Sequence, residues 1–389
     1  MRLLLVIPKL VSYRSFLRGL CMSLIAEGNE VHLACSHGKP GDDDMAGEDD
    51  RVPVHCIDFP RGMNPAAHLQ AARALNRLVT KLQPDIVHAH FSAAIFTTAM
   101  ARTTRWPVTF ATFHGVSFPA MTGWKAAILR MAETWAARHF DSVWVLTDDD
   151  RDALQAASRS AVVRRLPGYG MGCDLERFSP IPAATRDMLR AEMGIKPGEI
   201  VFSFVGRFTD FKGFGLAARA FLQIAVGNSN LRLLLIGLRD SLHPTGLNEA
   251  DERLLAASPR VIDAGYRNDV ERWLAAADIL VFPSRREGMP VCLMESLALG
   301  IPVITLDSRG CRDVVRDGID GLVLRDSQIG TLRSAMTRAA GDLELRLRWA
   351  AQAVAGRGRF NRNHFVAEQK AIYQSAAIPD CDDALAPAS

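Results

Sequence analysis

The chain has 389 residues, above the size at which one hydrophobic core usually stops growing, so two domains are expected. Hydrophobic residues make up 48% and charged residues 23%, a balance that excludes a disordered or collagen-like chain. Lys and Arg (46) nearly cancel Asp and Glu (43), and the net charge of +3 gives no reason to expect nucleic acid as a partner.

The chain begins with an apolar stretch that predicts a first β-strand. This stretch is too short for the core of a signal peptide, and Pro8 and Lys9 interrupt it. No apolar run approaches the roughly 20 residues that a membrane-spanning helix needs. The seven cysteines are scattered without a Cys-x-x-Cys spacing, as in proteins whose thiols stay reduced. We therefore expect a cytoplasmic protein.

Short apolar or β-branched runs alternate with helical patterns in both halves of the chain, which predicts an α/β protein with two doubly wound parallel sheets. The predicted strands are Leu3–Ile7, Glu30–Cys35, Ile86–Ala89, Val108–Phe113 and Ser142–Leu146, then Val201–Val205, Leu231–Ile236, Val261–Ile262, Ile279–Phe282 and Val303–Leu306. Prolines and glycines between 179 and 198 favour a linker there.

This pattern predicts two Rossmann-like domains, over 1–180 and 181–359, that face a ligand-binding cleft at the C-terminal ends of their strands. Residues 360–376 predict a last helix, which is a candidate to pack back on the N-terminal domain. The small and acidic residues over 377–389 predict a flexible tail.

The segment from Asp278 to Leu306 predicts a strand, a loop and a helix in that order. The helix extends over 290–299, because Pro290 at its first position and Gly300 after its last are typical start and stop residues. The loop between strand and helix is rich in charged residues. It therefore lies where parallel sheets usually bind ligands.

Two carboxylates belong to this segment. Glu287 lies in the loop, and Glu295 lies about 7 to 8 Å farther along the helix at 1.5 Å per residue. They can hold two ends of one polyhydroxylated ligand, while the N–H groups of Gly288 and Met289 favour an anion between them. The spacing alone leaves open that Glu287 is a surface loop residue and Glu295 a solvated helix residue.

A second loop carries two cations. The strand that ends at Val205 is followed by Gly206 and Arg207, and Lys212 comes just before the next predicted helix. Cations at a helix N-terminus are unfavourable unless an anion lies there, and a phosphate would satisfy them. The chain has neither a Gly-Lys-Ser/Thr phosphate loop nor a Gly-x-Gly-x-x-Gly turn in its first domain, which disfavours an NTPase or an NAD-dependent dehydrogenase.

These residues resemble the GT-B fold glycosyltransferases, in particular glycosyltransferase family 4 of bacterial surface-polysaccharide type. Glu287 to Glu295 is similar to the family's Glu-x7-Glu motif, and Gly206-Arg207 with Lys212-Gly213 is similar to its diphosphate-binding Gly-Arg and Lys-Gly. The resemblance implies a nucleotide-sugar donor, diphosphate contacts from the cations, a sugar contact from Glu287 and ribose contacts from Glu295. The implied donor-binding residues are Gly206, Arg207, Lys212, Tyr266, Arg267, Asn268, Glu287, Gly288, Met289, Pro290 and Glu295.

In the first domain, Thr112 to Gly115 resembles the family's Thr-x-His-Gly pattern, which implies that His114 lies near the reacting centre. Without the resemblance, His114 can equally be a satisfied residue at the end of a strand. We interpret His88 and His90 as structural, since two histidines without a third ligand are weak evidence for a metal. The first loop, residues 9–16, lacks the family's Gly-Gly. A similar Tyr- and Arg-bearing loop in a bacterial polysaccharide subgroup makes Tyr13, Arg14, Ser15 and Arg18 the candidate acceptor-binding residues.

The resemblance implies a retaining transferase that moves a hexose or N-acetylhexosamine, with UDP as the expected carrier, to a glycan or lipid-linked saccharide in envelope polysaccharide or glycoconjugate synthesis. The candidate catalytic residues are His114, Arg207, Lys212 and Glu287. Fixed cations can stabilise a diphosphate leaving group, so no metal or other cofactor is expected. The alternatives are a sugar-nucleotide epimerase or hydrolase, a non-catalytic nucleotide-sugar-binding partner, and a metal-dependent transferase that uses residues 148–150.

One predicted helix carries an apolar stripe of Trp124, Ile128, Met131 and Trp135, with Lys125, Arg130 and Arg138 around it. Such a stripe either packs in the core or rests on a membrane surface. The sequence leaves both open, so association with the inner membrane stays an expectation beside the cytoplasmic location.

Overall fold

The computed structural model describes residues 1–36, 51–60, 62, 64–240 and 243–377. They form two compact units. Unit 1 is Met1–Pro167 together with the C-terminal segment that begins at Asn363, and unit 2 is Gly168–Arg362. The boundary predicted from the sequence is near 180. Of the predicted tail over 377–389, only Ala377 lies within the described residues, and it ends the last helix.

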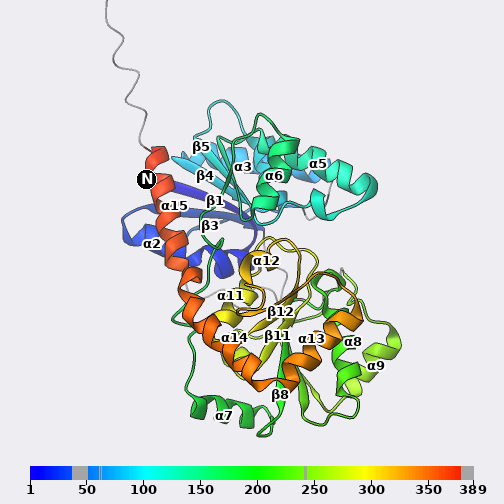
Figure 1. The fold of residues 1–389 in the computed structure, drawn as a ribbon. Helices are drawn as coiled ribbons and strands as arrows, with labels where there is room; N and C mark the ends of the chain where they lie inside the picture. Colours follow the sequence, from blue (N-terminus) through cyan, green and yellow to red (C-terminus); the bar gives the residue numbers. More distant parts are fainter. Residues whose placement is uncertain (37–50, 61, 63, 241–242, 378–389) are drawn as a thin grey trace, which may run out of the picture. The chain divides into compact units, whose positions relative to one another are not determined.

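Unit 1 is built on a parallel sheet with strand order β3-β2-β1-β4-β5-β6-β7. Its helices flank this sheet (Figure 1). The strands are β1 (Arg2–Lys9), β2 (Glu30–Ser36), β3 (Val54–Cys56), β4 (Ile86–His90), β5 (Val108–Phe113), β6 (Ser142–Val145) and β7 (Val163–Arg165). The helices are α1 (Leu10–Ser12), the π-helix η1 (Tyr13–Leu17), α2 (Arg18–Ala26), α3 (Pro65–Leu82), α4 (Ser92–Ala101), η2 (Phe118–Ala120), α5 (Gly123–Ala137), α6 (Asp148–Ala157) and α15 (Arg362–Ala377).

Unit 2 is built on a second parallel sheet, with strand order β10-β9-β8-β11-β12-β13. The strands are β8 (Ile200–Val205), β9 (Leu231–Ile236), β10 (Val261–Gly265), β11 (Ile279–Phe282), β12 (Val303–Leu306) and β13 (Gly321–Leu324). The helices are α7 (Ala183–Glu192), η3 (Asp210–Lys212), α8 (Phe214–Ala225), α9 (Glu249–Ala257), α10 (Val270–Ala275), α11 (Val291–Ala298), α12 (Cys311–Val314), α13 (Ile329–Gly341), α14 (Leu343–Gly356) and η4 (Arg357–Phe360). The predicted fold class is confirmed.

The central strands are buried and mostly apolar because helices cover both faces of each sheet. Leu3 to Ile7 in β1 and Ile279 to Phe282 in β11 are all fully buried. Burial of one such side chain contributes about 1.5 to 3 kcal/mol. These strands hold the loops at their C-terminal ends in fixed positions.

The C-terminal helix α15 packs on unit 1. Tyr373 is fully buried, and its hydroxyl lies 2.6 Å from Nδ1 of His88 in β4. Lys370 forms an ion pair with Glu27 and donates to Ser23, so α15 lies beside α2 (Figure 1). Just before α15, the amide of Cys173 donates to the carbonyl of Phe360 over 2.8 Å within unit 2.

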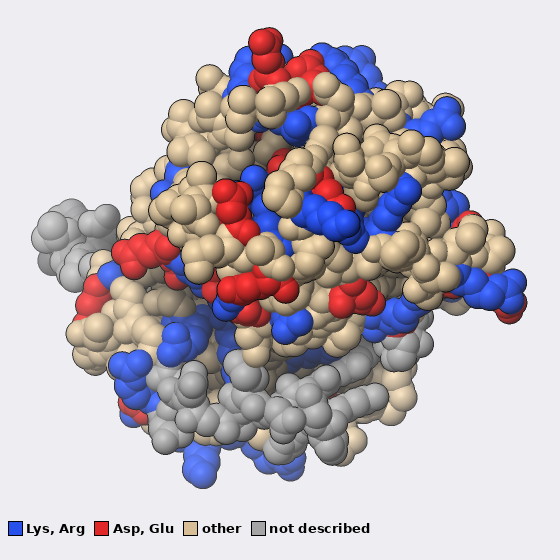
Figure 2. Space-filling model, turned by 90° about the horizontal axis from the view of Figure 1, so that it is seen from below, with Lys and Arg blue, Asp and Glu red and all other residues tan. Residues whose placement is uncertain are grey.

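Charged side chains on the face shown in Figure 2 are interspersed, with Lys and Arg beside Asp and Glu. This mixture agrees with the small net charge of +3. A nucleic-acid-binding surface would instead gather one sign of charge on one face.

Candidate donor site in unit 2

The loops that follow β8 and β11 meet at the C-terminal ends of these two strands in unit 2. The two strands are neighbours in the sheet, and Gly206 directly follows β8. A Cβ atom at Gly206 would lie 3.7 Å from Cδ of Lys212 and 3.8 Å from the ring of Phe282, the last residue of β11. The stem of Lys212 therefore lies along the ends of both strands.

Lys212 and Glu287, which the sequence singled out separately, form an ion pair. Nζ of Lys212 donates to Oε1 of Glu287 over 2.7 Å, and their side chains are only 18% and 12% exposed. Burial disfavours the charged lysine, but attraction to Glu287 and this hydrogen bond outweigh it, so the pKa of Lys212 lies above its usual value. A fixed positive charge is thus available at this edge.

Ser284 lies in the same loop as Glu287 and holds its carboxylate in place. Its buried hydroxyl donates to the same Oε1 of Glu287 over 2.8 Å and lies 3.2 Å from the carbonyl of Phe211. The amide of Arg285 also donates to Phe211, over 2.9 Å. Ser284 therefore ties the β11 loop to the β8 loop at the point where the ion pair forms.

Two glycines permit this close packing. Gly213 has φ +77°, and a Cβ there would lie 2.1 Å from the carbonyl oxygen of Pro283. Gly310 has φ +79°, and its Cβ would lie 2.3 Å from the carbonyl oxygen of Gly288. Any larger residue at either position would clash with backbone.

Arg207 pairs with a different acid. Its guanidinium forms an ion pair with Asp240 and lies 5.6 Å from the ring centre of Phe211. The side chain of Arg207 is 54% exposed, whereas that of Asp240 is 11% exposed. Arg207 also acts on Lys212 by charge repulsion, since it opposes the protonated form of that lysine. The two cations thus share one electrostatic environment.

Glu295 lies on α11 and is half-buried. Burial raises the pKa of Glu295 to about 7, against the opposing attraction of Arg177 and Arg362. A carboxyl with this pKa changes charge near neutral pH. The sequence motif predicted Glu295 as a site residue. It did not predict its neighbour Arg177, whose guanidinium pairs with Glu271.

The helix that carries Glu295 is slightly shorter than predicted. It spans Val291–Ala298, and Pro290 lies at the N-cap with extended backbone rather than at the first helical position. This difference arises because Pro290 is the last residue before the helical hydrogen bonds begin. Met289 is buried, and the carbonyl of Gly288 faces Gly310.

The segment predicted to contact the base follows β10. Tyr266 is 59% exposed. The guanidinium of Arg267 lies 4.2 Å from the ring centre of Trp273, so the cation stacks on an aromatic face. Asn268 accepts a hydrogen bond from Arg177 through its carbonyl. These residues lie in unit 2, in the loop after β10, the strand that pairs with β9.

In unit 1, His114 directly follows β5. Its Nε2 lies 3.1 Å from Nδ1 of His90, and its ring stacks on Phe91 with centres 4.1 Å apart. Burial lowers the pKa of His114 to about 3, so the ring is neutral at pH 7. His90 was interpreted as structural, and it is a direct partner of the histidine that the family motif singles out.

The candidate acceptor residues do not lie in a loop, which corrects the sequence-based interpretation of residues 9–16. Tyr13, Arg14 and Ser15 lie in the π-helix η1, and Arg18 begins α2. Tyr13 is buried, Arg14 is half-buried, and Ser15 and Arg18 are exposed. The segment lacks prolines and glycines from Leu10 to Arg18, so nothing stops it from continuing as helix. A π-helical turn is common at functional sites.

The three aspartates at 148–150, weighed as metal ligands, form the first turn of α6. Asp148 pairs with Arg151 over 2.6 Å, and Asp150 is buried and accepts from the amide of Val116 over 3.1 Å. Thr147 caps the helix. Their geometry therefore fits a helix start. Within the described residues, no group of three or more His, Cys, Asp or Glu is arranged to hold a metal ion.

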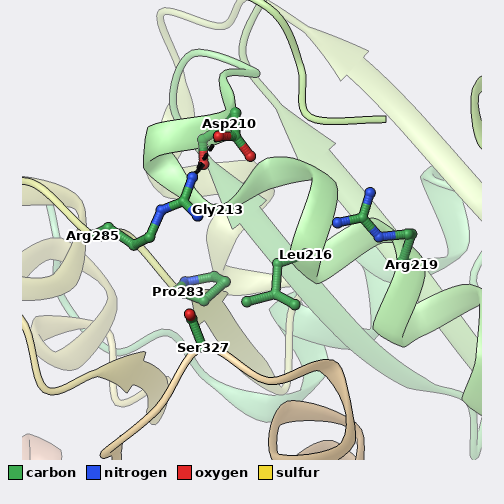
Figure 3. Close-up of a pocket in the computed structure, with 7 residues that line it drawn as sticks. All are labelled: Asp210, Gly213, Leu216, Arg219, Pro283, Arg285 and Ser327. Carbon is green, nitrogen blue, oxygen red and sulfur yellow. Dashed lines mark hydrogen bonds and ion pairs between the residues drawn. The ribbon is translucent and has the colours of Figure 1, made fainter. Parts of the chain in front are cut away.

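A cavity of about 70 Å³ adjoins the β8 loop (Figure 3). Arg285 turns toward Asp210 and pairs with it over 2.5 Å, and Leu216 projects from α8. The lining residues described are Asp210, Gly213, Leu216, Arg219, Pro283, Arg285 and Ser327, which include none of Arg207, Lys212, Glu287 and Glu295. The cavity is smaller than the roughly 300 Å³ of a typical ligand pocket, so it does not hold a nucleotide sugar.

Two family models cover most of the chain. Residues 199–342 match the family described as glycosyl transferases group 1, and residues 13–168 match the glycosyl transferase 4-like domain. The chain belongs to the GT-B glycosyltransferases of family 4 type. As a glycosyltransferase, it carries the Lys212–Glu287 pair within the first matched segment and His114 within the second.

The glycosyltransferase is similar to proteins of known name. It is 25% identical over 324 residues to UDP-Gal:alpha-D-GlcNAc-diphosphoundecaprenol alpha-1,3-galactosyltransferase of Escherichia coli, and this match covers 82% of each chain. Its fold matches sucrose-phosphate synthase of Thermosynechococcus elongatus (TM-score 0.79, 18% identity, 96% of this chain and 99% of that chain). It also matches Anabaena HepE in complex with UDP and glucose (TM-score 0.78, 18% identity, covering 97% of this chain and 100% of that chain). No helix among the described residues has the length and hydropathy of a membrane span.

Proposed function

We propose that this glycosyltransferase moves a hexosyl or N-acetylhexosaminyl group from a UDP-sugar to a glycan or lipid-linked saccharide, with retention of anomeric configuration. The observation that carries the proposal is the buried Lys212–Glu287 pair, which combines a fixed cation and a carboxylate where two strand ends meet. The named Escherichia coli relative uses UDP-Gal and a lipid diphosphate-linked sugar, which supports both substrate classes.

The proposed chemistry follows from the charges at the donor site. As the glycosidic bond to the donor breaks, the sugar becomes oxocarbenium-like and negative charge develops on the diphosphate. Arg207 and Lys212 stabilise that charge, so the leaving group needs no proton donor. Glu287 and Glu295 accept hydrogen bonds from the hydroxyls of the sugar and the ribose. A departing phosphate oxygen takes the proton from the acceptor hydroxyl, which attacks from the same face.

A donor screen with product analysis tests the function. UDP-glucose, UDP-galactose and their N-acetyl forms are each incubated with a panel of glycans and lipid-linked saccharides, and the anomeric configuration of any product is read by NMR. An acceptor-dependent α-linked product from an α-linked donor supports the proposal. Hydrolysis without transfer, interconversion of UDP-sugars, or tight UDP binding without turnover on the whole panel would instead indicate the hydrolase, the epimerase or the non-catalytic partner.

We also propose that no metal takes part, because Arg207 and Lys212 would supply two cations to the diphosphate in the proposed donor site. The test is the transfer rate in excess chelator after passage over a chelating resin. An unchanged rate supports the proposal. A loss of activity that Mg²⁺ or Mn²⁺ restores would contradict it.

We further propose that α5 lets unit 1 rest on the anionic inner face of a membrane. Trp124 is 70% exposed and Met131 68% exposed, which removes the alternative that these two members of the apolar stripe pack in the core. A groove of about 830 Å³ runs along the helix, lined by Phe118, Pro119, Met121, Ala126, Ala127, Arg130, Met131, Thr134, Trp135, Arg138 and Ala157.

The charges beside this groove favour an anionic surface as its partner. Lys125 and Arg130 are exposed, whereas Glu133, the one acid among the fully described residues of α5, is buried and accepts from Ser92 and from the amide of Ser117. Flotation with vesicles that contain phosphatidylglycerol tests the proposal. We expect Trp124→Ala with Met131→Ala to weaken binding, and a matched pair of exposed apolar residues in unit 2, Leu343→Ala with Leu347→Ala, to leave it unchanged. Equal flotation of both variants, or none by the wild type, would reject it.

A further inference from the structure

A short chain of histidines, of which His88 and His90 are buried and His114 is half-buried, lies at the C-terminal ends of β4 and β5. The two strands pair in parallel with His90 opposite Thr112, which brings His90 beside His114. His90 is 1% exposed, and its Nδ1 lies 3.1 Å from Nε2 of His114. Its other nitrogen, Nε2, is buried and has no hydrogen-bond partner in the described part of the chain. Such an unpaired buried group needs an explanation.

The ring of His114 is held on its other sides by aromatic residues. It lies nearly flat on Phe91, with an interplanar angle of 14°, and its centre is 5.9 Å from that of Phe16. Phe91 has φ +68°, a region that aromatic residues rarely adopt and that is often found at functional sites. The stacking fixes the plane of the His114 ring. Nε2 of His114 is engaged by His90, whereas Nδ1 makes no hydrogen bond to a described residue. Nδ1 is therefore available to a ligand.

Proton counting restricts the hydrogen bond between the two rings. Burial lowers the pKa of His114 to about 3 and that of His90 well below its usual value, so each ring carries one proton. Either His90 donates from Nδ1, or His114 donates from Nε2. The second arrangement would leave His90 with a buried N–H that has no acceptor, which is rarer in proteins than an unpaired acceptor. The first arrangement is therefore favoured.

We propose that His90 is a positioning residue that donates to Nε2 of His114 and thereby keeps the proton of His114 on Nδ1. His114 then donates a hydrogen bond to an oxygen of the bound sugar or acceptor and does not act as a general base. This inference rests on the proposed function, because it assigns the partner of His114 as a substrate oxygen. A neutral donor suits that task at every pH at which the protein is folded and the ring is uncharged.

His88 provides the comparison that separates positioning from packing. Its ring stacks on His90 with centres 4.0 Å apart, but its nitrogens are engaged by Tyr373 over 2.6 Å and by Thr112 over 2.8 Å. Removing the hydroxyl of Tyr373 therefore disturbs the same buried cluster without touching the bond between His90 and His114. Tyr373→Phe is the matched control for loss of a buried hydrogen bond.

The first experiment reads the tautomer directly, without substrate. Two-bond ¹H–¹⁵N correlations of histidine-labelled protein report which ring nitrogen of His114 carries the proton. We expect Nδ1–H in the wild type and in Tyr373→Phe, and a mixture of tautomers in His90→Phe, which fills the space but offers no donor. A wild-type His114 protonated on Nε2 would overturn the proposal whatever the enzyme transfers.

The second experiment reads the reaction. We expect His90→Phe to lower kcat for transfer by about 3- to 10-fold, the worth of one hydrogen bond, with KM for the donor within twofold. His90→Asn, whose side-chain N–H can replace the lost donor, should recover most of kcat, and Tyr373→Phe should keep it. His90→Asn as impaired as His90→Phe, or no loss in His90→Phe, would contradict the positioning role. If the wild type transfers no sugar but His114 is protonated on Nδ1, the proposed function has failed and the tautomer assignment stands.

Discussion

Nζ of Lys212 lies 2.7 Å from Oε1 of Glu287, although the two residues are 75 positions apart in the chain. The pair joins the two loops that the family resemblance assigns to the diphosphate and to the donor sugar. A bound diphosphate would compete with Glu287 for Lys212 and leave the carboxylate free to accept from sugar hydroxyls. In the proposed function, donor binding and release of Glu287 from Lys212 are therefore parts of one exchange of partners.

The first prediction concerns the charge of Lys212. Lys212→Ala removes a cation from the developing charge of the leaving group, and we expect kcat/KM for the donor to fall by about 100-fold or more. Arg285→Ala is the control, since Arg285 also forms an ion pair within these loops, with Asp210. It should keep kcat/KM within about threefold. Steady-state kinetics with the donor identified in the screen measures both, and equal losses in the two variants would argue against a specific diphosphate contact.

The second prediction concerns Ser284. Its hydroxyl donates to Glu287, and a hydrogen bond to a charged group contributes about 1.5 to 3 kcal/mol. Ser284→Ala should therefore lower kcat/KM by roughly 10- to 100-fold if the carboxylate must be held in place. Ser308→Ala removes a hydroxyl that donates to the carbonyl of Ser284 over 2.7 Å, so it disturbs the same loop through a different hydrogen bond. A loss in Ser308→Ala as large as that in Ser284→Ala would show that loop integrity, and not the carboxylate, is what matters.

The third prediction concerns Asp240, which holds Arg207. The side chain of Arg207 is 54% exposed, and ion pairs open to water contribute about 0.2 to 1 kcal/mol, so freeing Arg207 from Asp240 should strengthen binding of UDP only slightly. We expect Asp240→Asn to lower Kd for UDP by at most about fivefold and Arg207→Ala to raise it. Isothermal titration calorimetry measures both. Weaker binding of UDP by Asp240→Asn would mean that Asp240 orients Arg207 for the ligand instead of competing with it.

The fourth prediction concerns pH and Glu295. Its pKa is raised from the ordinary 4.5 to about 7, so between these values the folded protein binds more protons at this site than the unfolded protein. Stability from this group is therefore greatest below pH 4.5 and is lost as the pH rises through 7. Glu295→Gln should remove that fall from the free energy of unfolding. Denaturant titrations at several pH values compare the two proteins, and identical pH profiles would reject the raised pKa.

The same titration predicts how UDP binding depends on pH. Ionised Glu295 accepts more strongly from ribose hydroxyls than the neutral carboxyl does, so affinity should rise from pH 6 to pH 8 in the wild type. In Glu295→Gln, the pH dependence of UDP affinity comes only from the titration of UDP and of other protein groups. The difference between the two proteins is the contribution of Glu295, and a difference that does not change with pH would exclude a ribose contact through the charged form.

The fifth prediction concerns Gly213. Alanine there meets the carbonyl of Pro283 at 2.1 Å and must adopt φ +77°, so we expect a loss of about 2 to 5 kcal/mol of stability from strain and overlap together. Gly198 has a similar φ of +80° with no atom within 4 Å of a built Cβ. Gly198→Ala should cost only about 1 to 2 kcal/mol. Equal costs in chemical denaturation would mean that the β8 loop moves away from Pro283.

Much of the fold could be predicted because the central strands are buried on both faces and read as continuous apolar runs. Every predicted strand is present, and four have the predicted bounds: Val108–Phe113, Leu231–Ile236, Ile279–Phe282 and Val303–Leu306. The strands that were not predicted, β3, β7 and β13, all lie at sheet edges. They have only three or four residues each and are partly exposed, so they lack a periodic signal.

The site could be predicted only as far as its signals were local. Glu287, Glu295 and Lys212 stand in short motifs, whereas Asp240 carries no motif and becomes the partner of Arg207 through folding. The sequence singles out His90 only as half of a histidine pair, and folding makes it the partner of His114. The apolar stripe that includes Trp124 could not be assigned, because helical periodicity identifies an apolar face but not what covers it.

The contacts at Gly213 and Gly310 limit how this enzyme can be redesigned. Each places a main-chain carbonyl where a side chain would begin, so the three segments around Gly206–Phe214, Pro283–Pro290 and Ser308–Cys311 interlock at the level of backbone. A chimaera that imports one of these segments from another transferase would inherit a mismatch with the other two. A design that changes donor preference should therefore replace all three segments together, or alter only side chains that point away from these backbone contacts.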